Sequence, residues 1–133
     1  MKIKLSQLIN SVTSGALGHL ANTDLPIKTA FRLKSMLREC GTHIEDHDRL
    51  RADILSTHGT LNEEKGIYEF DSPEKQAEAD REYAELLRTE IDIPGEPLKL
   101  RDFHSSSAFR AAHLAELEWL IDTEFPAVAA GKH

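Results

Sequence analysis

The fold is decided by the stretch LPIKTAFRLKSMLRECGTHIEDHDRLRADILSTHG, residues 25–59. Pro26 suits the first turn of a helix, where backbone donors have no intrahelical partner, and Gly59 suits a helix end. Between them, apolar and small residues recur every three or four positions, the spacing of one buried side along an α-helix. This side comprises Ala30, Leu33, Leu37, Cys40, Ile44, His47, Leu50 and Ile54. The pattern predicts one long helix, over roughly residues 26–58, that packs lengthwise against another.

The second helix follows after a change in sequence character. The letters NEEKG (62–66) predict a turn, and Ile67–Phe70 a short strand with which Thr60 and Leu61 pair. Ser72 then suits a helix cap, and Pro73 begins an amphipathic stretch that extends to roughly residue 90. The two helices, about 26–58 and 72–90, are expected to form an antiparallel hairpin.

Short strands and terminal helices complete the expected fold. Alternating apolar residues predict strands near 1–5, 66–70, 90–94 and 97–101, and the last two are expected to face each other across Pro94-Gly95. One helix should follow Ser6, and another should follow the serines at 105–107 and carry Phe109 to Ile121. We therefore predict an α+β fold, mainly α, as a single compact domain over 1–125, with a flexible tail at 126–133.

Charge and hydropathy narrow the class of protein. The chain has 133 residues, with 16 basic and 23 acidic ones, and its formal charge of −7 opposes non-specific binding to nucleic acids or anionic membranes. No local basic patch is apparent. The apolar runs fall far short of the roughly 20 residues that span a bilayer, and the first residues lack the apolar core of a signal peptide. We expect a soluble intracellular protein without direct nucleic-acid or membrane contact.

The strongest chemical signal lies within the long helix. Cys40, His43 and His47 share one side of it, and thiolate and imidazole are both zinc ligands. A zinc-protease helix needs a glutamate directly after its first histidine, but Ile44 stands there. Our preferred interpretation is that Cys40 and His47 fill the helix seam, with a metal-dependent hydrolase as the alternative. We expect no catalytic residue, metal or cofactor.

Large apolar residues outnumber the places that so small an interior offers. Those outside the simplest apolar stripes are Ile27 and Leu55, together with four aromatic residues, Phe31, Phe109, Trp119 and Phe125. Aromatic residues gathered at a surface commonly mark a protein contact, so these four are the candidate interaction residues and self-association is expected. The alternative is that Trp119 seals the core of a monomer.

The order of elements supplies a resemblance. Leu25, Pro26, Lys28, Thr29 and Ala30, then Glu85, Leu86, Leu87, Glu90 and Ile91, then Leu98 and Leu100, resemble short proteins of unknown function encoded by tailed phages and prophages. The resemblance implies a phage context and brings no catalytic residues with it.

Our leading hypothesis is accordingly a non-enzymatic phage interaction protein, a virion-associated or assembly factor, in the host cytoplasm or on the virion. The alternative binding role is an acidic inhibitor of a host defence or nucleic-acid-binding protein.

Overall fold

The computed structural model describes residues 1–103 and 109–122. It is 61% helical, which confirms a mainly α class of α+β fold. Phe125 and the expected tail at 126–133 lie outside the described residues. The helices are α1 (Leu5–Thr13), α2 (Ala16–Ala21), α3 (Ile27–His58), α4 (Pro73–Leu87) and α5 (Ala111–Glu116), and a 3₁₀ turn spans Leu100–Asp102. The strands are β1 (Lys2–Lys4), β2 (Thr60–Asn62), β3 (Ile67–Glu69), β4 (Glu90–Asp92), β5 (Leu98–Lys99) and β6 (Ile121–Asp122).

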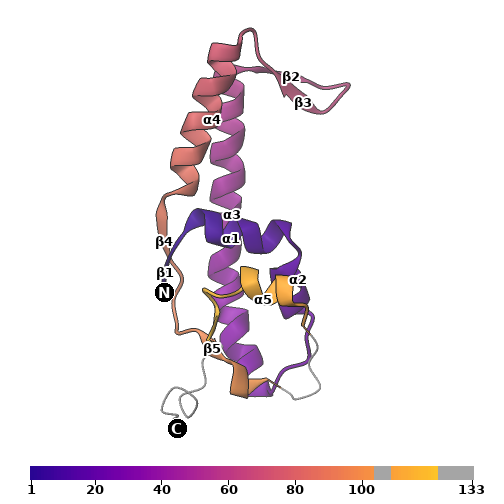
Figure 1. Cartoon of the computed structure of the whole chain (residues 1–133), viewed down its shortest axis with the longest axis vertical. Helices are drawn as coiled ribbons and strands as arrows, with labels where there is room; N and C mark the ends of the chain where they lie inside the picture. Colours follow the sequence, from indigo (N-terminus) through magenta and orange to yellow (C-terminus); the bar gives the residue numbers. More distant parts are fainter. Residues whose placement is uncertain (104–108, 123–133) are drawn as a thin grey trace.

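Helix α3 is the spine of the molecule. Its 32 residues give a length of about 48 Å. Pro26 precedes its first residue, and the helix ends where Gly59 N–H donates to the Leu55 carbonyl at 2.8 Å. Helix α4 lies along its second half, whereas α1, α2 and α5 lie beside its first half (Figure 1). We call the α3–α4 part with β2 and β3 the arm, and the remainder the base.

The arm matches the hairpin that the sequence predicts. The Ser72 hydroxyl accepts a hydrogen bond from the Lys75 backbone N–H at 3.3 Å, and Pro73 begins α4. Strands β2 and β3 pair antiparallel, with Leu61 opposite Tyr68, as expected. This ribbon projects sideways from the far end of the arm (Figure 1).

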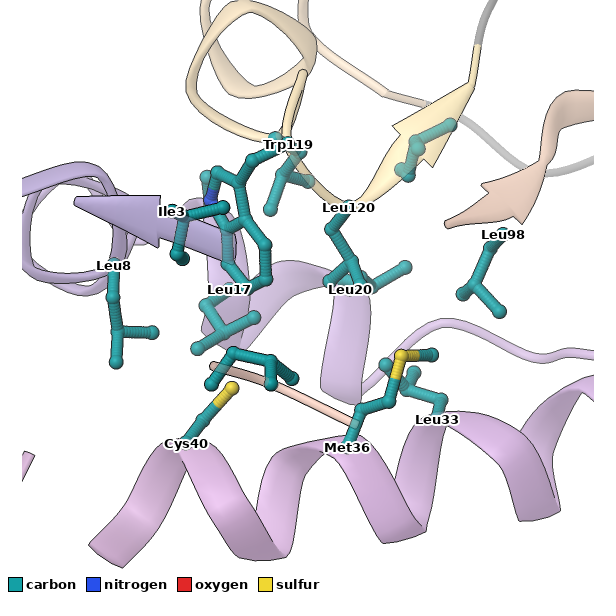
Figure 2. Packing of buried hydrophobic residues seen from close by; sticks show 14 of the residues in the cluster. Ile3, Leu8, Leu17, Leu20, Leu33, Met36, Cys40, Leu98, Trp119 and Leu120 are labelled. Atoms are coloured by element: carbon teal, nitrogen blue, oxygen red, sulfur yellow. The ribbon is translucent and has the colours of Figure 1, made fainter. Parts of the chain in front are cut away.

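The hydrophobic core lies in the base. Side chains from α1, α2, the first half of α3 and the segments after α4 meet there (Figure 2). Its fully enclosed members include Leu8, Leu20, Ile93, Leu98, Leu117 and Leu120. In the arm, by contrast, the buried residues are Ala79 and His47. The base therefore supplies most of the apolar burial, and the arm is a thin two-helix projection from it.

The expected N-terminal helix is divided. Helix α1 begins one residue before Ser6, and the Gln7 side-chain oxygen accepts a hydrogen bond from the Lys4 N–H at 2.8 Å. The chain then turns at Gly15, whose φ of +82° favours glycine, and continues as α2. This turn lets Ala16, Leu17 and Leu20 enter the same core as Leu8.

The expected pairing of the strands on either side of Pro94-Gly95 is wrong. Strand β4 pairs antiparallel with β1, with Ile3 opposite Ile91, and β5 pairs in parallel with β6, with Leu98 opposite Ile121. The Met1 amino group also donates to the Ile93 carbonyl at 2.6 Å. Strands β4 and β5 each pair with a segment distant in sequence, because this arrangement brings Ile3, Ile93 and Leu98 into one core.

The predicted C-terminal helix is also too long. Helix α5 ends at Glu116, and a turn and strand β6 follow. Leu117, Trp119, Leu120 and Ile121 are all buried. At 100° per residue, a continued helix would point Trp119 about 160° away from Leu117. Ending the helix lets all four side chains enter the core.

Candidate functional site

Cys40 and His47 lie in different parts of the molecule, and His43 lies between them where the arm joins the base. Cys40 is 1% exposed, in the core of the base, and its burial raises the pKa of the thiol from 9.0 to about 11. His47 is 6% exposed, within the arm. The burial of both is what the helix-seam interpretation predicts. Over residues 1–103 and 109–122, no three potential ligands converge on a point that could hold a metal ion.

The two histidines are engaged in holding the arm. His47 Nε2 lies 2.9 Å from the Tyr83 hydroxyl on α4, and its Nδ1 lies 2.9 Å from the Asp48 carboxylate. The guanidinium of Arg51 stands 5.7 Å from the centre of the Tyr83 ring. His43 Nε2 is 3.3 Å from the backbone carbonyl of Asp92, where the arm joins the base. These contacts link α3 to α4 and to β4.

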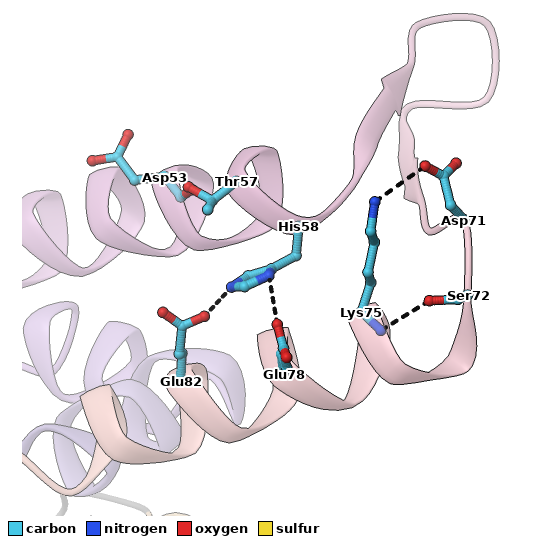
Figure 3. Close-up of polar contacts among 8 residues, drawn as sticks. All are labelled: Asp53, Thr57, His58, Asp71, Ser72, Lys75, Glu78 and Glu82. Atoms are coloured by element: carbon cyan, nitrogen blue, oxygen red, sulfur yellow. Dashed lines mark hydrogen bonds and ion pairs between the residues drawn. The ribbon is translucent and has the colours of Figure 1, made fainter.

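A third histidine closes the far end of the arm. His58 extends from α3 between two glutamates of α4, contacting Glu82 through Nε2 and lying 3.5 Å from Glu78 through Nδ1 (Figure 3). Its side chain is 15% exposed. Carboxylate oxygens only accept hydrogen bonds, so the imidazole is the donor in the Glu82 contact. No local sequence pattern indicates this contact, because it joins residues at least 20 positions apart.

An apolar hollow of about 340 Å³ opens between α2 and α3. Cys40 lines it, together with Leu17, Leu37, Gly41 and Ile44. A smaller hollow of about 210 Å³ shares Ala21 and Leu37 with it and reaches Lys34. The lining offers apolar contact and, with a protonated thiol at Cys40, no nucleophile.

A surface that we call the basic face covers the outside of α3 in the base. It consists of Ile27, Lys28, Phe31, Lys34 and Arg38, all of which are exposed. Ile27 is 73% and Phe31 62% exposed, although both are large and apolar. Among the described residues, Lys28, Lys34 and Arg38 form no ion pair, whereas Arg32 beside them lies 3.7 Å from Asp102. Unpaired cations here surround two apolar side chains.

This face corrects the inference that the chain has no local basic patch. Residues 1–38 hold six basic residues and one acidic residue, a formal charge of +5. The signal is visible in the sequence, because residues 26–38 contain four cations and no anion. The net charge of the whole chain conceals it.

The arm carries the opposite charge. Residues 39–90 hold six basic and fifteen acidic residues, a formal charge of −9. On α4, Glu74, Glu78 and Glu85 are exposed and lie along one side of the helix, because they are spaced by four and seven residues. We call these three residues the acidic stripe. The molecule is therefore electrostatically polar, with cations at one end of α3 and anions at the other.

The structure separates the candidate interaction residues. Phe31 is exposed, as a contact residue should be. Phe109 is partly buried, with its ring 4.9 Å from that of His19 and 5.7 Å from that of Phe103. Trp119 is 8% exposed and lies in the core (Figure 2), where the alternative to a contact role places it.

Comparison with known proteins adds no identification. The chain matches no protein-family model, no curated protein and no solved structure. Among the described residues, no helix has both the length and the apolar character needed to cross a membrane.

Proposed function

We propose that this chain is a non-enzymatic interaction protein of a tailed phage or prophage, acting as a virion-associated or assembly factor. The observation that carries the proposal is the basic face, where Ile27 and Phe31 are exposed among cations that form no ion pair with any described residue. Exposed large apolar groups that adjoin each other and are rimmed by charge favour a protein contact, since burying them removes apolar area from water. The phage context rests on the sequence resemblance.

Mass spectrometry of purified particles from the encoding phage tests this function. We expect the protein in particles or in assembly intermediates, and its absence from both would contradict the proposal. A variant with Ile27→Ser and Phe31→Ser should be lost from them, while retaining its helical circular dichroism.

The matched control is Leu61→Ser with Ile67→Ser. These residues are 45% and 51% exposed on the ribbon of the arm, so the control removes a similar pair of apolar groups from the other end. The control variant should be retained. Equal loss of both variants would show that the basic face is not the contact.

A second candidate is an acidic inhibitor of a host defence or nucleic-acid-binding protein. The charge of −9 over residues 39–90 supports it, because an acidic arm complements a basic groove. A pull-down of host proteins at low salt tests it. A nucleic-acid-binding partner should be recovered and then released as the salt concentration rises, whereas recovery of none would count against this candidate.

A further inference from the structure

The basic face and the acidic stripe match each other in length as well as in charge. The basic face extends from residue 27 to 38 and the stripe from residue 74 to 85, so each covers twelve residues of helix. At 1.5 Å per residue, both are about 16 Å long. The two faces therefore match in length, and the cations Lys34 and Arg38 of one are opposite in charge to Glu74, Glu78 and Glu85 of the other.

Their surfaces are also complementary in side-chain size. The basic face presents Ile27 and Phe31, whereas Ala77 and Ala84 are exposed on α4 beside the stripe. Small alanines leave space against which a phenylalanine ring can pack. The cation Arg81 lies within the stripe, three residues after Glu78 and four before Glu85, so this side of α4 carries three acidic residues and one basic one.

The two surfaces of one chain cannot meet. Because α4 runs antiparallel to α3, the Tyr83 contact with His47 and the Glu78 contact with His58 place α4 level with residues 47–58. Phe31 is therefore about 24–40 Å away along the axis of α3. This exceeds the screening length of about 10 Å at moderate salt, so neither surface neutralises the other.

We propose that the basic face binds the acidic stripe of a second copy of this chain, head to tail. This inference deepens the proposed function, on which it rests, by naming the partner. Each copy that has bound through one surface keeps the other free. Such heterologous contacts build a closed ring when the rotation between copies closes, and an open filament otherwise.

Sedimentation velocity and light scattering over a range of concentrations test self-association. We expect the wild type to grow beyond a dimer, and to dissociate when salt rises from about 0.1 M to about 1 M, which shortens the screening length from about 10 Å to about 3 Å. A wild type that stays monomeric up to high micromolar concentration overturns the proposal.

Charge reversal on each surface supplies the decisive comparison. Lys34→Glu with Arg38→Glu disables the basic face, and Glu74→Lys with Glu85→Lys disables the stripe. Each variant alone should associate at least about tenfold more weakly than the wild type. The matched control reverses Glu63 and Glu64 in the turn between β2 and β3, off the stripe, and should associate like the wild type.

Mixing the two disabled variants distinguishes a head-to-tail contact from a symmetric one. Each variant retains one intact surface, so the equimolar mixture should associate more strongly than either variant alone. Failure of the mixture to pair, with helical circular dichroism intact in both variants, overturns the proposal.

The outcome is separable from that of the proposed function. A monomeric wild type whose incorporation into particles depends on Phe31 overturns self-association alone. If the two disabled variants pair with each other but the protein is absent from particles and assembly intermediates, only the phage role is overturned.

Discussion

The hydrogen bond between Tyr83 and His47 should hold α4 to α3, and the variant Tyr83→Phe tests this. The substitution removes only the hydroxyl, which lies 2.9 Å from His47 Nε2. The ring remains to pack 5.7 Å from the imidazole and 5.7 Å from the Arg51 guanidinium. Any loss of stability therefore reports on the polar contact and not on a cavity.

The magnitude follows from burial. His47 is 6% exposed, so water has little access to the nitrogen that loses its partner. Leaving a buried polar group unsatisfied costs about 1–3 kcal/mol, whereas a whole domain of this kind is stable by only about 5–15 kcal/mol. We expect Tyr83→Phe to lower the free energy of unfolding by about 2 kcal/mol.

Urea denaturation followed by circular dichroism measures this loss. With a denaturant dependence of about 1–3 kcal/mol per M, the midpoint should fall by roughly 1 M. Hydrogen exchange should locate the effect in α4, whose amides should exchange about 30-fold faster. The matched control is Tyr68→Phe on β3, where the described residues give the hydroxyl no hydrogen bond, and a change below about 0.5 kcal/mol is expected. If Tyr83→Phe has no greater effect than Tyr68→Phe, the contact does not stabilise the arm.

Further predictions concern the helix ends and the thiol. Gly59→Ala should lower the melting temperature, because the added Cβ would lie 2.8 Å from the Glu69 carbonyl oxygen; a neutral result would refute this close approach. Ser72→Ala removes the acceptor for the Lys75 N–H and should cost about 1 kcal/mol in urea denaturation, whereas an unchanged midpoint would mean that the cap is not stabilising. Cys40 of the folded protein should react with an aromatic disulfide reagent at pH 8 about 100-fold more slowly than Cys40 of the unfolded chain, because burial raises its pKa from 9.0 to about 11. Equal rates would contradict its burial. Since the folded state retains that proton, stability should also fall as pH rises from about 9 to about 11, and Cys40→Ala should lack this component of the fall.

Elements that depend on near neighbours along the chain can be predicted from the sequence. The apolar period between Pro26 and Gly59 predicted α3 to within a residue or two, and Ser72 before Pro73 predicted the start of α4. Helical hydrogen bonds and caps join residues three or four positions apart, so their signals are contained in short stretches. The turn at 62–66 predicted the β2–β3 ribbon for the same reason.

The charge of the surface was also present in the sequence, but its arrangement was not. The sequence has four cations and no anion over residues 26–38, which predicts a basic segment. Only the tertiary packing leaves Phe31 exposed and, within the described residues, Lys34 and Arg38 without an ion pair. A residue's exposure depends on which elements cover it.

The pairing of distant segments and the positions of the aromatic residues depend on tertiary packing. Strand β4 pairs with β1, almost 90 residues earlier in the sequence. Helix α5 ends at Glu116, and Trp119 and Leu120 then enter the core. Tertiary packing also places Cys40 in the core of the base and His47 in the arm, although the two residues share one side of α3. Short-range patterns cannot specify such outcomes, because the free energy gained by burying apolar groups depends on the whole set of side chains that meet in the core.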